Sequence, residues 1–408
     1  MSKPYDAIIV GARCAGSPLA MLLARKGHRV LVVDKTSFPS DTLSTHVVHP
    51  RPVAALQRWG LLDQLVATGC PPIHTYDFHF GPLVLSGAPG TPESPVAYCP
   101  RRTVFDKILV DAAAAAGAEV RTGFAVDEIL EEDGRVVGIA GHDAGGGARI
   151  TERARVVIGA DGRYSMVAKA VHAQTYNERP PLQGGFYSYW SDLPMNGRFE
   201  TFIGDGLGFA AAPTHDDLTM VVGGWKIADW ESRKQTPEAS YDALTRSSPE
   251  FAERMRDARR VDRVHGAASA NFFRKPYGPG WALVGDAGYH KDPITAQGIL
   301  DAFRDAEGCA GALDAVFRGE RTFDAAMAGF QRARDEEVLP MYELTLGIAA
   351  MAPPPPEMQA VFGAIHGNQA AMDGFARVNA GTTSPAAFFA PDSIGPIMAA
   401  AGARAARG

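Results

Sequence analysis

The first residues whose types and spacing indicate a binding site form a glycine turn. This turn lies between an apolar run and a segment with a helical pattern. Residues 11–16 read Gly-Ala-Arg-Cys-Ala-Gly. Gly11 permits a tight turn, and Gly16 lets a helix pack closely on a strand. A helix that starts here offers free N–H groups and its positive dipole end to a pyrophosphate. The turn therefore predicts a dinucleotide site, and Cys14 and Ala15 are included in it.

Two charged positions refine this dinucleotide site. Arg13 occupies the place of the middle glycine, so its side chain must point away from the turn or contact the ligand. Asp34 ends the next apolar run, where a carboxylate accepts hydrogen bonds from ribose hydroxyls and repels a 2′-phosphate. The adenosine half of FAD or NAD fits, whereas that of NADP does not. Lys35 follows directly and belongs to the same predicted site.

Two later segments repeat the arrangement of an apolar run followed by glycine and aspartate. Asp161 and Gly162 follow one run, and Gly285 and Asp286 end another. A carboxylate beside a glycine turn either contacts a ligand or stabilises the turn itself. Both alternatives stay open for Asp161. Turns at the ends of neighbouring parallel strands lie along one edge of a sheet, where ligands bind in such folds.

The full set of motifs resembles a known family. Together with the helix opening at 102–106, the stretch 159–165, Pro293 and Gly298, the turns resemble the flavoprotein monooxygenases related to p-hydroxybenzoate hydroxylase. That superfamily also contains geranylgeranyl reductases and flavin-dependent halogenases. The resemblance covers the chain to about Ala306, and it implies an FAD bound in extended form.

The resemblance also implies roles for individual residues. Arg102 is expected to reach the ribityl or phosphate region of FAD, and Asp286 to accept a ribityl hydroxyl. The backbone of Gly298 and Ile299 is expected to face the N1–C2 edge of the flavin. N–H groups that open a helix there stabilise the negative charge of a reduced flavin. Asp161 resembles a family motif shared between FAD and NAD(P)H binding.

Some positions depart from the family pattern. Gly288 and Tyr289 stand where the family usually has Ala-His, and a histidine comes one place late at His290. Leu300 stands where asparagine is common. The Trp-x-Trp-x-Ile-Pro signature of the halogenases is absent, and the nearest string, 225–230, does not match it. A halogenase is therefore disfavoured.

The reaction implied by the resemblance is oxygen insertion. Only one dinucleotide fingerprint exists, so NAD(P)H either docks transiently beside the flavin or a separate flavin reductase supplies electrons. Reduced flavin then reacts with O₂ to give a C4a-hydroperoxide, which hydroxylates an aromatic or polyketide-like small molecule. No catalytic side-chain group is required. The alternatives are a double-bond reductase of the geranylgeranyl reductase type and a non-enzymatic flavin or ligand binder.

The segments between the motifs predict the remaining architecture. We expect an α/β fold (α+β overall), with a Rossmann-like FAD-binding domain, an inserted β-sheet substrate domain and a helical C-terminal tail. The predicted boundaries are 1–70, 100–179 and 276–330 for the FAD-binding domain, 71–99 and 180–275 for the β-rich substrate domain, and 331–408 for the tail.

The inserted segments supply the substrate wall in this scheme. Their strand-like runs carry many aromatic residues, of which most pack in a core and the rest face an apolar ligand. The loop 41–46 falls near the expected flavin ring, although a plain surface loop is an equal alternative. The substrate-side candidates are His46, Tyr189, Phe202, Trp225 and Pro293.

Composition excludes several other classes. The 408 residues carry a net charge of −6, which argues against a nucleic-acid binder. The four cysteines are scattered without zinc spacing, so neither a disulfide framework nor a metal site is expected. Isolated histidines, His79 among them, are interpreted as structural or exposed. No apolar run is long enough for membrane insertion. We expect a cytoplasmic monomer or homodimer.

Overall fold

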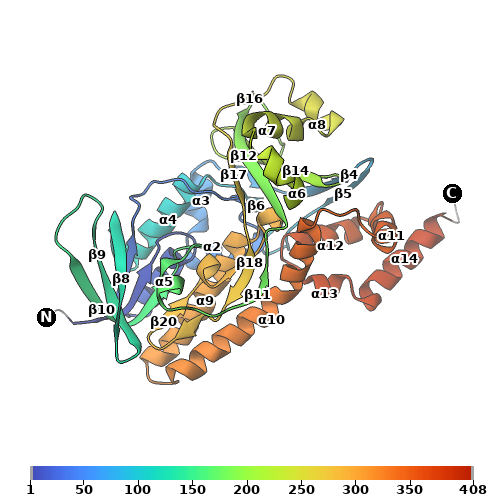
Figure 1. The fold of residues 1–408 in the computed structure, drawn as a ribbon. Coiled ribbons are helices and arrows are strands. Elements are labelled where there is room, and N and C mark those ends of the chain that lie inside the picture. The colour runs from blue at the N-terminus through green and yellow to red at the C-terminus, as the bar shows by residue number, and fades with distance from the viewer. Residues whose placement is uncertain (1–2, 406–408) are drawn as a thin grey trace.

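The computed structural model describes residues 3–405 and is built on a mostly parallel sheet (Figure 1). Its strands run in the order β19-β20-β10-β1-β2-β7, and all neighbours are parallel except β19 and β20. The nearly continuous apolar sequences of β1, β2 and β20 suit strands that are buried on both faces. The strands are β1 (Tyr5–Val10), β2 (Val30–Asp34), β7 (Glu119–Thr122), β10 (Ile150–Gly159), β19 (Tyr277–Gly278) and β20 (Trp281–Leu283).

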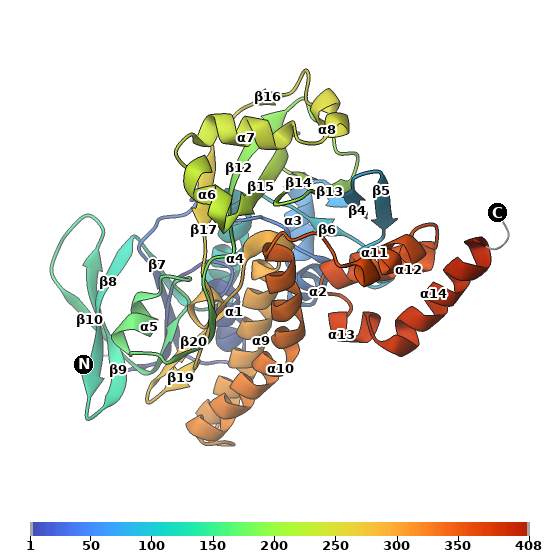
Figure 2. The same ribbon diagram turned by 45° about the vertical axis from the view of Figure 1, so that its right-hand side comes forward.

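One face of this sheet is covered by helices. Leu19 of α1, Phe105 of α4 and Phe303 of α9 are buried together in one core with the strands. The long helix α10 lies along α9 (Figure 2). The helices are α1 (Gly16–Arg25), α2 (Pro50–Trp59), α3 (Leu62–Ala67), α4 (Arg102–Ala115), α9 (Gly298–Phe317) and α10 (Phe323–Ala349).

The other face is covered by a ribbon of β8 (Phe124–Glu132), β9 (Arg135–Asp143) and the first half of β10, together with α5 (Met166–Ala170). Asp133 and Gly134 join β8 to β9, and both have positive φ angles of 50° and 73°. That is the conformation of the tight hairpin turn expected for Asp-Gly. The Asp133-Gly134 pair therefore closes a β-hairpin between β8 and β9.

A second large sheet, mostly antiparallel, stands beside the first. Its order is β16-β12-β15-β14-β13-β4-β5, with β17 also on β12. We call it the substrate sheet, after its predicted role. Its strands are β4 (Thr75–Phe80), β5 (Leu83–Gly87), β12 (Gln183–Ser191), β13 (Arg198–Ile203), β14 (Leu207–Pro213), β15 (Thr219–Lys226), β16 (Arg259–Arg260) and β17 (His265–Ala268).

The substrate sheet has a separate core on each face. One face packs under α6 (Ile227–Arg233), α7 (Pro237–Thr245) and α8 (Pro249–Arg254), and we call it the outer face (Figure 1). The opposite, inner face packs against residues of the tail, including Phe362 and Phe375. The tail helices are α11 (Pro356–Ile365), α12 (Gln369–Asn379), α13 (Pro385–Phe388) and α14 (Pro391–Ala405).

Short strands complete the fold. β3 (Pro72–Ile73) pairs with β6 (Ala97–Tyr98), and β11 (Thr175–Arg179), β18 (Asn271–Arg274) and β21 (Tyr289–His290) form a three-stranded sheet. Across residues 3–405, no helix is both long and apolar enough to cross a membrane. The predicted fold class is confirmed. The short helices α6 to α8 lie within the segment 180–275, which the sequence predicted as β-rich without naming any helix.

Candidate functional site

The first glycine turn brings β1, α1 and β10 into close contact. Gly11 has a φ angle of +104°, and a Cβ added there would lie 2.4 Å from the Ala160 carbonyl oxygen. A Cβ at Gly16 would lie 1.8 Å from the Gly11 carbonyl oxygen. Neither position accepts a side chain, since both obstacles are backbone. The two glycines thus have the close packing that the motif predicts, and α1 begins at the turn.

Asp34 supports the turn from the end of β2. One carboxylate oxygen accepts from the Ala12 N–H at 2.9 Å, and the other accepts from the Thr36 N–H at 2.8 Å. Each carboxylate oxygen has a second lone pair, so the group keeps capacity for a ribose hydroxyl. Lys35 is exposed beside it. The location fits the predicted adenosine end of the site.

Arg13 points away from the turn and binds Asp106 of α4. Its Nη1 lies 2.5 Å from Asp106 Oδ2, and further bonds reach Ser40. Arg102 contacts the same carboxylate through Nε at 2.9 Å and Nη2 at 3.0 Å. The Cys14 thiol lies 3.4 Å from Asp106 Oδ1. A single fully buried carboxylate therefore fixes two cations at the opening of α1 and α4.

The protonation states in this cluster follow from burial and charge. Burial acts to lower the pKa of Arg102, but the charge of Asp106 outweighs it and the pKa is raised. Burial raises the pKa of the Cys14 thiol, which stays protonated and donates to the carboxylate. The cluster therefore holds two cations around one anion, a net positive charge next to the helix N-terminus where a pyrophosphate is expected.

Asp161 caps the helix α5. Its oxygens accept from the Ser165 hydroxyl at 2.5 Å and from the Met166 N–H at 2.7 Å. Burial raises the pKa of Asp161. Gly162, next to it, has a φ angle of +80° and open space where a Cβ would lie. The structure thus shows the turn-stabilising role for Asp161, and a ligand contact of this residue stays a prediction.

The third turn packs against the first. Gly285 has a φ angle of +57°, and a Cβ there would lie 2.9 Å from the Cβ of Ala15. Asp286 follows and pairs with His290, whose Nδ1 lies 3.2 Å from Asp286 Oδ2. Burial acts to raise the pKa of Asp286, but the charges of His290 and nearby cations outweigh it, so the pKa is lowered. Asp286 is therefore an anion with part of its surface still accessible.

The opening of α9 is exposed at the same place. A Cβ on Gly298 would meet open space, and Pro293 nearby is also exposed. Ile299 is buried in the core beneath. Because the first N–H groups of a helix have no intrahelical acceptor, Gly298 and Ile299 present theirs to this space. Asp301, which contacts Lys291 and Arg304, anchors the first turn of the helix.

Two of the substrate-side candidates lie together on the inner face of the substrate sheet. His46, fully buried, forms a hydrogen bond through Nε2 with the Tyr189 hydroxyl, and its Nδ1 has no partner in residues 3–405. Burial lowers the pKa of His46 to about 3, so the ring is neutral. Tyr187 packs edge-on against the same ring, and the Arg101 guanidinium lies 4.5 Å above the Tyr189 ring.

Phe202 and Trp225 are placed elsewhere. Both belong to the core of the outer face, under α6 to α8. Because side chains alternate along a strand, their positions in β13 and β15 point away from the inner face that carries Tyr189. They are core residues, and the structure does not bring them to the side of the sheet where His46 lies. Pro293 remains at the opening of α9.

Comparison with known proteins identifies the family of this arrangement. Residues 4–328 match the model of a family described as an FAD binding domain. The chain belongs to this family. This flavoprotein is accordingly an FAD-dependent oxidoreductase, and the resemblance seen in the sequence is confirmed. The N-terminal four fifths of the chain match the family model.

Individual relatives differ in chemistry. The flavoprotein is 28% identical over 345 residues to digeranylgeranylglycerophospholipid reductase 2 of Methanococcoides burtonii, with 79% of this chain and 78% of that protein covered. It is 27% identical over 329 residues to 6-methylpretetramide 4-monooxygenase of Streptomyces rimosus, covering 74% and 73%. The myxobacterial chondrochloren halogenase CndH shares the fold, with a TM-score of 0.79, 23% identity and coverage of 98% and 97%.

The residues present fit an FAD. Gly298 and Gly162 leave space where a Cβ would intrude, and Asp34 retains acceptor capacity. Arg13 and Arg102 supply fixed positive charge. The close contacts of Gly11 with Ala160 and of Gly285 with Ala15 bring the turns together along one edge of the sheet, so that the predicted positions Gly11, Cys14, Ala15, Gly16 and Gly285 lie there. Their individual contacts with FAD stay predictions. When bound, FAD supplies the redox chemistry of the site.

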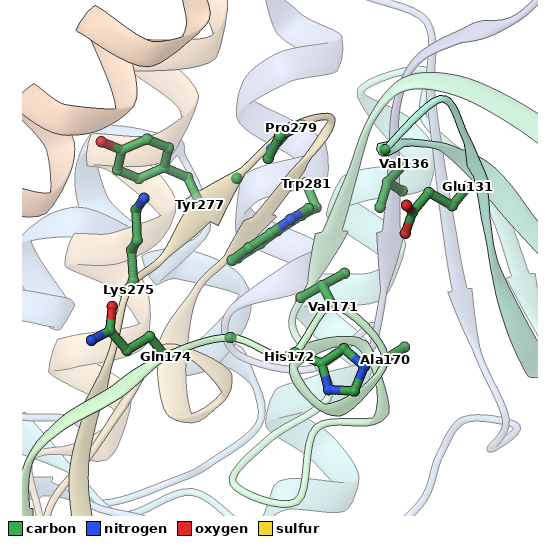
Figure 3. Close-up of a pocket in the computed structure, with 13 residues that line it drawn as sticks. Glu131, Val136, Ala170, Val171, His172, Gln174, Lys275, Tyr277, Pro279 and Trp281 are labelled. Atoms are coloured by element: carbon green, nitrogen blue, oxygen red, sulfur yellow. The ribbon is translucent and has the colours of Figure 1, made fainter.

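A pocket of about 370 Å³ opens at a different place, between the β8–β9 ribbon, α5 and β19 (Figure 3). His172, Lys275 and Trp281 are among the residues around it. None of the predicted FAD or substrate residues lines it. We therefore locate the candidate site at the carboxyl edge of the parallel sheet, where ligands bind in folds of this kind.

Three residues that contact the predicted site residues were not themselves predicted from the sequence to belong to the site. Asp106 lies four residues after Arg102 on α4, a spacing that pairs charges on a helix. Arg101 precedes Arg102 and reaches Tyr189. His290 pairs with Asp286 at i, i+4. The i, i+4 spacing of Arg102 and Asp106 indicates their ion pair in the sequence. The contact of Arg101 with Tyr189 depends on the fold and has no such signal.

Proposed function

We propose that this flavoprotein is a monooxygenase that hydroxylates an aromatic or polyketide-like small molecule, with O₂ as co-substrate and NAD(P)H as electron donor. The observation that carries the proposal is the polar and aromatic cluster of His46, Tyr187, Tyr189 and Arg101 on the inner face. A ring that bears hydroxyl groups suits such a wall, because it needs both aromatic contact and hydrogen bonds. The 6-methylpretetramide 4-monooxygenase relative supports the choice.

The electrostatics connect this cluster with the cofactor edge. The charge of Asp286 helps to raise the pKa of Arg102, and the charge of Arg102 helps to lower the pKa of His46. The charge of Arg102 therefore interacts with both Asp286 at the predicted ribityl region and His46 at the predicted substrate wall. FAD supplies the oxygen-transfer chemistry when bound. The α9 N–H groups stabilise negative charge beside it.

His46 and Tyr189 are assigned to substrate orientation. Burial raises the pKa of Tyr189, so its hydroxyl stays protonated, and His46 is neutral. In the tautomer whose Nε2 accepts the tyrosine hydroxyl, Nδ1 carries an N–H with no partner among residues 3–405. A hydroxyl or carbonyl oxygen of the substrate would satisfy it. The role of His46 and Tyr189 is therefore to bind and orient a polar group of the substrate.

The test is product mass together with an oxygen label. With NAD(P)H, air and phenolic polyketides, the proposal expects substrate-stimulated oxygen uptake. The product should gain one oxygen atom from ¹⁸O₂, while the second oxygen atom leaves as water and NAD(P)H is oxidised. If NAD(P)H is not oxidised directly, an added flavin reductase should restore turnover. A product without label would contradict the proposal.

A double-bond reductase is the second candidate. The digeranylgeranylglycerophospholipid reductase relative favours it. In that case anaerobic turnover with a polyprenyl substrate would add two hydrogen atoms to the product, and oxygen would only compete for electrons. Binding of a ligand without redox turnover under either condition would instead support a non-enzymatic binder.

A further inference from the structure

Asp77, His79 and Glu200 converge on the outer face of the substrate sheet. Asp77 and His79 are two residues apart on β4, so both side chains point to the same face. β13 runs parallel to β4, and its register places Glu200 opposite Asp77. One nitrogen or oxygen atom from each of the three side chains lies within 4.8 Å of the other two.

Two of these atoms are buried without a partner. Asp77 Oδ1 and His79 Nε2 form no hydrogen bond within residues 3–405. The side chains of Asp77 and Glu200 are only 6% and 7% exposed. Leaving a carboxylate oxygen and an imidazole nitrogen unsatisfied in the same buried place is costly. A ligand that accepts electron pairs from both would remove that cost.

Charges around the cluster set the orientation of the carboxylates. Arg198 Nη1 lies 2.5 Å from Asp77 Oδ2, and Arg254 Nη1 of α8 lies 2.6 Å from Glu200 Oε2. Each arginine engages one oxygen of its carboxylate. The arginine side chains are 45% and 30% exposed, so their charges are partly screened by water. Hydrogen bonds of this kind commonly orient the carboxylates that bind metals.

We propose that Asp77, His79 and Glu200 bind one divalent metal ion of the zinc type. One imidazole nitrogen and two carboxylate oxygens are ligands that Zn²⁺ accepts, with water completing the coordination. The purely oxygen ligands preferred by Mg²⁺ and Ca²⁺ are not what this site offers. The local spacing of cysteines and histidines gives no sign of this metal site, because Glu200 reaches Asp77 and His79 only through strand pairing.

The location assigns the ion a structural role. His79 stacks on Phe202 within the core of the outer face, on the opposite side of the sheet from Tyr189. The ion ties β4 to β13, two strands from the separate segments that build the substrate sheet. It therefore stabilises the wall of the substrate site without touching the substrate, and it is independent of the reaction that the flavoprotein performs.

Zinc binding by the full-length, FAD-loaded protein tests the proposal. After chelator treatment, equilibrium dialysis against Zn²⁺ and elemental analysis should give one ion per chain, and the melting temperature should rise with Zn²⁺. His79→Gln and Glu200→Gln should each weaken binding at least about tenfold. The matched control His74→Gln, which changes an exposed histidine near the start of β4, should leave affinity unchanged.

The unchanged protein provides a second measurement if a variant does not fold. A crystal soaked in Zn²⁺ should give an anomalous peak between the three side chains. A peak elsewhere, no stoichiometric zinc in the wild type, or equal binding by wild type, His79→Gln and Glu200→Gln would overturn the proposal. In those cases the three side chains form a buried polar cluster that binds no metal.

Discussion

The two large sheets present their functional groups in different ways. The parallel sheet offers backbone at strand ends, where Gly11, Gly16 and Gly285 allow segments to approach within contact distance. The substrate sheet offers side chains across two faces, so that Tyr189 on β12 and Trp225 on the adjacent β15 belong to different cores. The site on the parallel sheet can be predicted from local glycine motifs. The site on the substrate sheet depends on how side chains alternate between the two faces of each strand and on the register between strands.

This difference determines how each region responds to change. A backbone site fails when a Cβ is added, because the obstacle is a backbone atom at Gly11 and Gly16 and the Cβ of Ala15 at Gly285, and none of these can move to another rotamer. A side-chain site tolerates replacement of one group but depends on which face that group occupies. Variants at the parallel sheet should therefore act on folding and FAD binding, and variants on the inner face should act on turnover.

Gly16→Val should have the largest effect. The added Cβ would lie 1.8 Å from the Gly11 carbonyl oxygen, so β1 and α1 separate and stability falls by more than about 4 kcal/mol. Gel filtration and circular dichroism should show little folded protein and no bound FAD. The control Gly311→Ala, a helical glycine of α9 with open space at its Cβ, should be neutral or stabilising by about 0.5–1 kcal/mol. A folded, yellow Gly16→Val protein would contradict the packing argument.

Asp106→Ala should come next. It leaves Arg102 buried and Arg13 half-buried without their shared carboxylate, which should cost about 3–5 kcal/mol in urea unfolding. FAD affinity should fall as the two cations lose their orientation. Asp111→Ala, on the same helix and in an exposed pair with Lys107, should change stability by less than about 0.5 kcal/mol. Equal effects of the two variants would remove Asp106 from its assigned role.

Asp286→Ala should weaken FAD binding while leaving the fold intact. One charge-assisted hydrogen bond corresponds to about 1.5–3 kcal/mol, or roughly a tenfold to hundredfold loss of affinity. Fluorescence titration of apoprotein with FAD measures it. The control Asp229→Ala, at a half-exposed residue of α6, should bind FAD normally. Unchanged flavin affinity in Asp286→Ala would exclude this carboxylate from the cofactor site.

Acid should destabilise the protein through His46. Burial lowers its pKa to about 3 in the folded chain, against 6.5 when exposed. The unfolded chain therefore binds a proton below pH 6.5 that the folded chain refuses, so stability present above that pH is lost as pH falls. By pH 5 the loss is about 2 kcal/mol for this residue. Urea unfolding at pH 7 and pH 5 should show a smaller loss in His46→Gln, and an identical loss would contradict the burial argument.

The features that could be predicted from the sequence are those that depend on residues close together in the chain. The turn at Gly11, the carboxylate Asp34 and the Asp-Gly hairpin follow from local backbone requirements. The contact between Arg13 and Asp106 joins residues 93 positions apart, and no local pattern reveals it. Phe202 and Trp225 were grouped with Tyr189 because all are aromatic, whereas strand register decides which face each one occupies.

Flavin content tests the central claim most directly. The glycine turns at three strand ends, together with Arg13, Arg102 and the opening of α9, form one site for one extended FAD. Purified protein titrated with FAD should therefore bind one flavin per chain and show the yellow absorbance of a flavoprotein. A folded protein that stays colourless and leaves added FAD free would contradict the account.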